Sequence, residues 1–137
     1  MINVNKGIVF DKGASDGIFH FTHIDNVDIA LNENSSGPTN HVGIEVGTGC
    51  NVYSPFIKAN IKMTTACSGL YANGTIKHGL INLCVESTQV NTGYGVYFDS
   101  GAVNANNQSF FLAHNNMNTA VQNNSANCES IDVKPVP

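Results

Sequence analysis

The chain has no arginine, no tryptophan and few charged side chains of either sign. Only 12% of its 137 residues are charged, and the formal net charge is −4. Proteins that bind duplex DNA or RNA need a clustered basic surface, so this composition argues against a nucleic-acid partner. No apolar run reaches the roughly 18 residues of a membrane-spanning helix, and the first residues lack the apolar core of a signal peptide. We therefore expect a soluble protein that does not insert into membranes.

Signals for helices are also weak. Asparagine, glycine and threonine form helices poorly, and twenty of the residues are asparagine. No long stripe of apolar residues recurs with the helical period of about 3.6. Short runs of valine, isoleucine and phenylalanine instead alternate with turns rich in glycine and asparagine, which is typical of β-structure.

The four cysteines, Cys50, Cys67, Cys84 and Cys128, form no Cys-x-x-Cys pair, which argues against a zinc site. Cys84 lies in the apolar run 83–85, and we expect it to be a buried free thiol. Free thiols favour folding in a reducing compartment.

Four segments of the chain begin with the same pattern of a glycine, an aliphatic residue, a variable residue and an apolar residue. Their glycines are Gly7, Gly43, Gly69 and Gly95, which lie 36, 26 and 26 residues apart. The longer interval contains the polar stretch 32–39, which we expect to be a surface loop. Without that loop the period is 26 throughout, and a decayed fifth copy begins at Ala120. Repeats of this length indicate a solenoid or another array.

Stacked strands place equivalent residues of successive repeats above one another, about 4.8 Å apart. Side chains alternate along a strand, so the two apolar positions should point inward and the variable position between them outward. The first inward column is Ile8, Ile44, Leu70, Val96 and Val121, and the second is Phe10, Val46, Ala72 and Phe98. The outward column is Val9, Glu45, Tyr71 and Tyr97. The glycines should mark a corner that tolerates only glycine, and Asp11, Asn73 and Asp99 should cap the following turns.

These observations predict an all-β fold, a right-handed parallel β-helix (solenoid) of about five coils with a repeat of about 26 residues. Residues 1–137 would form a single domain, with the repeats over about 7–121 and a C-terminal extension over 122–137, and we expect a fragment of a larger chain. The prolines of the extension should keep it from continuing a central strand, so that it folds back or joins a neighbouring subunit. The alternative, an antiparallel β-sandwich, would not explain the fixed period.

A regular β-helix rich in asparagine, glycine, serine and threonine resembles the shaft of bacteriophage tailspikes and related tail-fibre, receptor-binding proteins. The resemblance spans about residues 7–121 and is one of architecture and composition, since no catalytic signature of the group is present. The repeated phrases are also similar to those of pectate lyases, polygalacturonases and bacterial adhesins. The resemblance implies a homotrimer of the virion tail, folded in the host cytoplasm, that binds bacterial cell-surface polysaccharide and in some members cleaves it.

Glycoside hydrolysis usually needs two carboxylates. Asp11 and Glu45 lie on adjacent coils, and we expect them about 8 Å apart, within the range of about 6.5–9.5 Å for an inverting enzyme. A simpler interpretation makes Asp11 a turn cap and Glu45 a solvated surface residue. A lyase would use cationic groups such as arginine, which the chain lacks. We therefore expect binding without catalysis and without a cofactor.

The histidines do not suggest a metal site. His20 and His23, three residues apart, would point to opposite faces of one strand, and the other histidines occupy unrelated positions in the repeat. We expect them to be surface or hydrogen-bonding residues.

The outward tyrosines Tyr71 and Tyr97 would form an apolar ledge, with Asn73 and Asp99 at its rim. Sugars bind by stacking an apolar face on aromatic rings while polar groups bind their hydroxyls. The same face could instead pack against another subunit, where tyrosine is also common. Three functions therefore stay open: a glycan-binding adhesion module, a polysaccharide depolymerase and a structural shaft segment.

Overall fold

The structure, a computed structural model, describes residues 3–13, 17–31, 39–63, 67–89, 93–105, 109–128 and 132–135. Over these residues it is all-β, and every pair of neighbouring strands is parallel. None of them forms a helix of the length and apolarity needed to cross a bilayer. The parallel pairing contradicts the alternative of an antiparallel sandwich.

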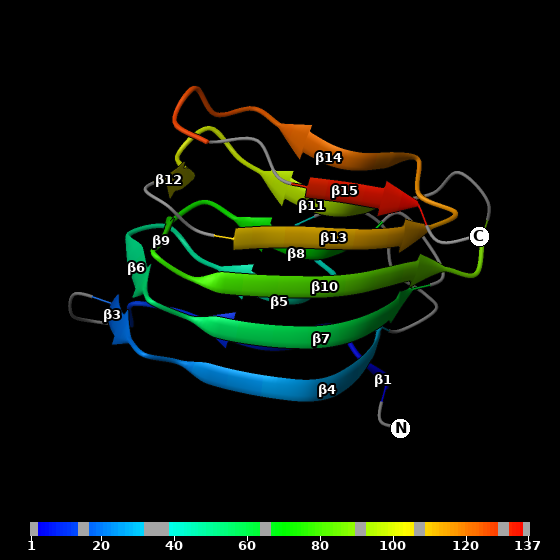
Figure 1. The fold of residues 1–137 in the computed structure, drawn as a ribbon, viewed down its shortest axis with the longest axis horizontal. Coiled ribbons are helices and arrows are strands. Elements are labelled where there is room, and N and C mark those ends of the chain that lie inside the picture. The colour runs from blue at the N-terminus through cyan, green and yellow to red at the C-terminus, as the bar shows by residue number, and fades with distance from the viewer. Residues whose placement is uncertain are drawn as a thin grey trace.

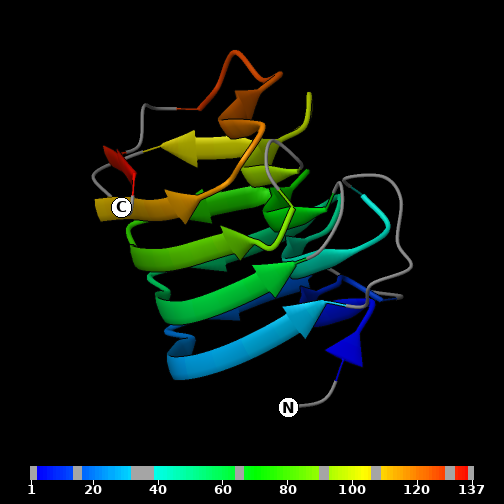
Figure 2. The same cartoon turned by 90° about the vertical axis from the view of Figure 1, so that its right-hand side faces the viewer.

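Three parallel sheets enclose the interior (Figures 1 and 2). The six-stranded sheet runs β1 (Asn3–Val4), β4 (His23–Leu31), β7 (Phe56–Met63), β10 (Leu80–Ser87), β13 (Ser109–Asn115) and β15 (Asp132–Pro135). The five-stranded sheet runs β2 (Lys6–Phe10), β5 (Val42–Val46), β8 (Ser68–Ala72), β11 (Tyr94–Phe98) and β14 (Thr119–Asn123). The four-stranded sheet runs β3 (Gly17–His20), β6 (Cys50–Tyr53), β9 (Thr75–Lys77) and β12 (Val103–Ala105).

The chain visits the three sheets in a fixed order. The strands β2, β3 and β4 belong in turn to the five-, four- and six-stranded sheets, and the next three strands repeat the sequence one position further along each sheet. We call one such visit to all three sheets a pass. The 26-residue repeat is therefore the length of a pass, apart from the one with the insertion.

The strand register confirms the predicted columns. Ile8 pairs with Ile44, Ile44 with Leu70, Leu70 with Val96, and Val96 with Val121. Phe10, Val46, Ala72 and Phe98 form the second column and are all buried. The core between the sheets is completed by aliphatic residues of the six-stranded sheet, including Ile57, Ile61, Ile81, Leu83 and Leu112.

The glycine column lies where the backbone of the next pass comes close. A Cβ atom at Gly43 would lie 2.6 Å from the carbonyl oxygen of Gly69 and 2.7 Å from the Ile61 side chain. At Gly69 it would lie 2.6 Å from the carbonyl oxygen of Gly95. Each of these glycines is the second residue of its strand, so the column does not mark a corner as expected. The position is reserved for glycine by lack of space, because none of these glycines has a positive φ.

Two details differ from the expectations, and a third expectation falls outside the described residues. Cys84 is exposed, because the strand alternates and its neighbours Leu83 and Val85 take the inward positions. Within the C-terminal extension, the described residues 132–135 form β15, which pairs with β13 as an edge strand, where proline is tolerated. The polar stretch 32–39 lies, except for its last residue, outside the described residues.

One of the three expected turn caps, Asp99, is present at its own turn. The Ser100 amide donates to Asp99 Oδ1 (2.7 Å) within the same turn. The Gly101 amide donates to Asn73 Oδ1 (3.0 Å), so Asn73 caps the turn of the following pass rather than its own. Among the described residues no backbone amide donates to Asp11, so the capping role predicted for it is not seen there.

Candidate functional site

The predicted tyrosines meet on the outside of the five-stranded sheet. Tyr71 of β8 pairs in register with Tyr97 of β11, and their ring centroids lie 5.8 Å apart at 34°. A third ring, Tyr94, meets the ring of Tyr97 edge to face at 5.2 Å and 85°. We call Tyr71, Tyr94 and Tyr97 the tyrosine surface. Tyr94 was not predicted, because strand alternation would place a residue three positions from Tyr97 on the opposite face.

Hydrogen bonds hold these rings in place. The Tyr71 hydroxyl donates to Asp99 Oδ2 (2.8 Å), and the Asn124 side-chain amide donates to the Tyr97 hydroxyl oxygen (2.9 Å). The Asn73 amide donates to Thr48 Oγ1 (2.8 Å). The four predicted site residues are therefore brought together, but most of their polar atoms bond to one another or to neighbouring turns.

The members of the tyrosine surface differ in how open they are. Tyr71 points outward yet is only 8% exposed, because the adjacent ring and Asp99 cover it. Burial, followed by the hydrogen bond and the negative charge of Asp99, raises the pKa of Tyr71 above its ordinary range, so its hydroxyl stays protonated. Tyr94 and Tyr97 are partly exposed. They, rather than Tyr71, offer the accessible ring surface.

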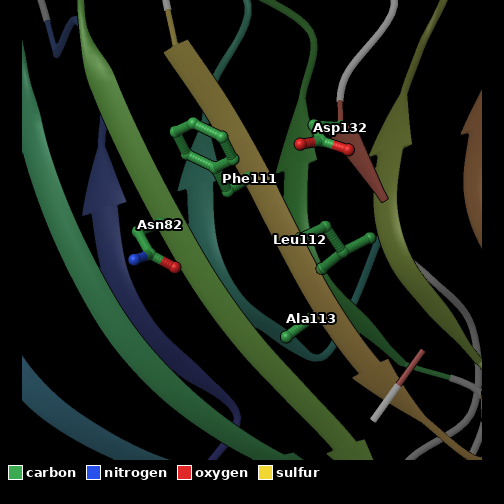
Figure 3. A pocket seen from close by; sticks show the side chains of 5 residues that line it. All are labelled: Asn82, Phe111, Leu112, Ala113 and Asp132. Carbon is green, nitrogen blue, oxygen red and sulfur yellow. The ribbon is translucent and has the colours of Figure 1, made fainter. Parts of the chain in front are cut away.

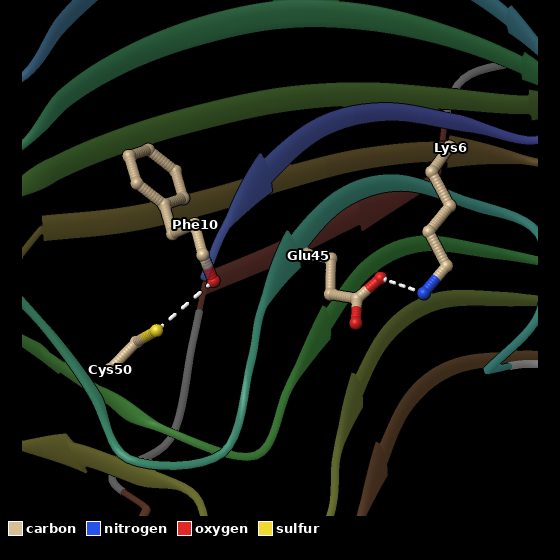
Figure 4. Close-up of polar contacts among 4 residues, drawn as sticks. All are labelled: Lys6, Phe10, Glu45 and Cys50. Carbon is tan, nitrogen blue, oxygen red and sulfur yellow. Dashed lines mark hydrogen bonds and ion pairs between the residues drawn. The ribbon is translucent and has the colours of Figure 1, made fainter. Parts of the chain in front are cut away.

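Of the two carboxylate candidates, Asp11 follows the end of β2, and Glu45 lies in β5 of the five-stranded sheet. Glu45 Oε2 forms an ion pair with Lys6 Nζ, and the Glu45 side chain is 15% exposed. The expectation that Glu45 is a solvated surface residue is therefore wrong, since the lysine and the sheet cover it. Figure 4 shows this ion pair, together with the hydrogen bond that Cys50 Sγ donates to the carbonyl oxygen of Phe10 (3.1 Å).

Two of the histidines, His20 and His23, stack on aromatic rings of the next pass. His20 ends β3 and stacks on Tyr53 at 5.2 Å, and His23 begins β4 and stacks on Phe56 at 4.7 Å. The prediction that the two histidines share a strand is wrong, because a corner separates β3 from β4. In the part of the chain that the structure describes, no three histidine, cysteine or acidic side chains are grouped closely enough to hold a metal ion.

A hollow of about 220 Å³ lies on the outside of the six-stranded sheet (Figure 3). It is lined by Asn82, Phe111, Leu112, Ala113 and Asp132. The sequence analysis missed it, because Phe110, Phe111 and Leu112 form a continuous apolar run that hides which residue faces outward. Strand alternation could have predicted the outward position of Phe111, because its two neighbours, Phe110 and Leu112, point inward.

Comparisons of the chain with protein-family models, with curated proteins and with solved structures found no match.

Proposed function

We propose that the three sheets form a right-handed parallel β-helix of about five coils, and that the chain is a carbohydrate-binding adhesion module without catalytic activity. Its ligand is a bacterial cell-surface polysaccharide. Its setting is a virion tail, as the resemblance to bacteriophage tailspikes implies. The observation that carries the binding proposal is the partly exposed ring of Tyr97, fixed between two other tyrosines and a hydrogen-bonded amide.

A fixed ring is a suitable platform for a sugar. Binding is weakened when side chains must be ordered on association, and each mobile side chain costs roughly 0.5–1.5 kcal/mol. The Tyr97 ring contacts Tyr71 and Tyr94, and its hydroxyl accepts a hydrogen bond from Asn124. Next to it the Gln122 amide donates to Asn124 Oδ1 (2.7 Å), so these side chains are also held in place, and each keeps further donor and acceptor capacity for hydroxyl groups. The platform is therefore ordered before any ligand arrives.

The absence of catalysis is proposed because the nearby carboxylates are already engaged. Asp99 accepts hydrogen bonds from the Tyr71 hydroxyl and the Ser100 amide, and Glu45 is paired with Lys6. Hydrolysis of a glycosidic bond needs one carboxyl group that can protonate the leaving oxygen and a second that assists the attack. Neither Asp99 nor Glu45 stands open to a ligand in that way.

We further propose a homotrimer. Strands at the two ends of each sheet have a neighbour on one side only, which leaves backbone donors and acceptors unpaired. Most homo-oligomers have closed symmetry, and three-fold symmetry is what the resemblance to tailspikes implies. Size-exclusion chromatography with light scattering should give three times 14.6 kDa. A 14.6 kDa monomer that persists from nanomolar to high micromolar concentration refutes the trimer.

The function is tested with bacterial surface polysaccharides on a glycan array, followed by titration of any glycan that binds. Tyr97→Ala removes the stacking ring and should weaken binding about tenfold or more, since a stacked ring contributes on the order of 1–2 kcal/mol. Tyr97→Phe is the matched control, because it keeps the ring and loses only the bond to Asn124. Its affinity should stay close to that of the parent chain.

Equal affinity of a folded Tyr97→Ala variant refutes the tyrosine surface as the binding site. Release of reducing sugar that disappears in Asp11→Asn would establish a depolymerase in place of a binding module. Melting curves of all variants, measured by circular dichroism, separate loss of binding from loss of folding.

A further inference from the structure

The hollow on the six-stranded sheet combines an exposed ring with polar groups on both sides of it. Asn82 of β10 pairs with Phe111 of β13, which in turn pairs with Asp132 of β15. The three residues thus occupy the same position on three adjacent strands, with about 4.8 Å between strands. Figure 3 shows the ring between the amide and the carboxylate, with Ala113 further along the same strand.

Phe111 is an exposed large apolar side chain in the middle of an otherwise buried run. The ring is 41% exposed, whereas the side chains before and after it, Phe110 and Leu112, are buried in the core. Ala113 on the far side is small, so it leaves the space next to the ring open. A single exposed apolar side chain is ordinary on a protein surface and does not by itself indicate a binding site. A ring that borders a hollow and has polar side chains on both sides is a different case.

The polar groups of the hollow are available to a ligand. Over the described residues, the side chains of Asn82 and Asp132 make no hydrogen bond or ion pair within the chain. On the tyrosine surface, by contrast, Asp99 and Asn73 bond to neighbouring groups. Hydroxyl groups can donate to the Asp132 carboxylate and can both donate to and accept from the Asn82 amide.

The chemistry favours a neutral ligand rich in hydroxyl groups. An anion next to Asp132 would be repelled, whereas a pyranose offers an apolar face of C–H groups to the ring and hydroxyls at its edges. The volume of about 220 Å³ is below the roughly 300–1,000 Å³ of pockets that enclose drug-sized ligands. The hollow therefore suits one or two sugar residues of a longer chain that lies across the sheet.

We propose that this hollow is a saccharide subsite in which one pyranose ring stacks on Phe111 while Asn82 and Asp132 bind its hydroxyls. It is separate from the tyrosine surface, which belongs to another sheet. The proposal rests on the carbohydrate-binding function above only for the class of ligand, and each surface can be tested without the other.

The test is an amide chemical-shift titration of the isotope-labelled chain. The probes are the methyl glycosides of glucose, galactose and mannose at millimolar concentrations, followed by any glycan that binds on the array. Saturable shifts should appear at the amides of Asn82, Phe111 and Asp132. Phe111→Thr should weaken this binding about tenfold, and Asp132→Asn should weaken it by a smaller factor.

Two controls keep the result interpretable. Phe111→Tyr keeps the stacking ring and should keep the affinity. Ile18→Thr removes an exposed apolar side chain from a strand of the four-stranded sheet, distant in the chain from the hollow, and should change nothing. Melting curves establish that Phe111→Thr is folded.

The outcomes distinguish the two surfaces. Binding that survives Tyr97→Ala but is lost in Phe111→Thr supports the hollow and refutes the tyrosine surface. Binding that survives in folded Phe111→Thr, with shifts confined to Tyr94 and Tyr97, overturns the hollow and leaves the proposed function intact. If no glycoside and no array glycan shifts the amides around Phe111, the subsite is refuted.

Discussion

Phe21 is held in a backbone conformation that residues with a side chain rarely adopt. Its φ is 52°, and the equivalent corner residues of the next two passes, Ser54 and His78, have φ of 51° and 58°. The corner conformation is fixed by hydrogen bonds between passes: the Phe21 amide donates to the Tyr53 carbonyl (3.0 Å), and the Ser54 amide donates to the Lys77 carbonyl (2.8 Å). The ring of Phe21 is 79% exposed, so the free energy gained by packing the ring offsets little of the cost of this backbone conformation.

Substitution by alanine and by glycine isolates that strain. A Cβ atom in the left-handed region costs roughly 1–2 kcal/mol, and Phe21→Ala keeps this cost whereas Phe21→Gly removes it. Glycine loses more backbone entropy on folding, about 0.5–1 kcal/mol relative to alanine. Phe21→Gly should therefore be more stable than Phe21→Ala by about 0.5–1 kcal/mol, or about 2–5 °C in melting temperature for a chain of this size. Both variants lose the same ring, so the comparison does not depend on its contacts.

Thermal and urea unfolding followed by circular dichroism measures the difference. Ser54→Gly and Ser54→Ala should show the same order at the next pass. At Lys58, an exposed residue in the middle of β7 with ordinary φ, the usual order should hold and alanine should be the more stable. If alanine is as stable as glycine or more stable at both corner positions, the corners are not strained and the reasoning is wrong.

Two substitutions test the stacking of the passes by thermal unfolding, and chemical labelling tests the exposure of two cysteines. Gly69→Ala places a Cβ 2.6 Å from the carbonyl of the next pass and should destabilise by about 1–3 kcal/mol, whereas Ala120→Gly should stay within about 1 kcal/mol of the parent. Val96→Asp buries an unpaired charge in the core and should cost several kcal/mol, so a melting temperature close to that of the parent would contradict the inward column. Iodoacetamide should label exposed Cys84 in the native protein at pH 8, whereas burial raises the pKa of Cys50, keeps that thiol protonated and should protect it. Equal labelling of both cysteines, found by mass spectrometry, would argue against this difference in exposure.

The sequence predicted the register of the five-stranded sheet, because the spacing of Gly43, Gly69 and Gly95 counts the residues in one pass. It could not predict how far an outward side chain is exposed. Tyr71 points outward and is nonetheless covered, because its neighbours in the column stand about 4.8 Å away and can lean over it. Strand alternation gives the direction of a side chain, and the sizes and hydrogen bonds of its neighbours decide its burial.

Continuous apolar runs were the other source of error. Residues 83–85 and 110–112 are continuous apolar runs, yet Cys84 and Phe111 occupy outward positions in the middle of them. A fully buried strand and a strand with one apolar outward residue have the same composition, so periodicity cannot separate them. The hollow at Phe111 also depends on Asp132, which reaches it only because β15 pairs with β13, and no repeat in the sequence indicates that pairing.

The two ends of the stack differ, and the difference constrains how copies can associate. The glycine column consists of Gly7, Gly43, Gly69 and Gly95, and each glycine lies close to a carbonyl oxygen of the following pass. These oxygens belong, in the same order, to Gly43, Gly69, Gly95 and Ala120. The fifth position of the column is Ala120, which carries the Cβ that the other four lack. At this end the inward positions also become polar: Asn104 continues the column of Ile76 and is 1% exposed, and His114 continues the column of Val85. A second copy stacked on this end in the same register would press a carbonyl against the Ala120 Cβ, whereas Asn104 and His114 are already paired with Cys128 and with β15 of the same chain. Side-by-side association avoids this clash, and it is compatible with the closed trimer proposed above.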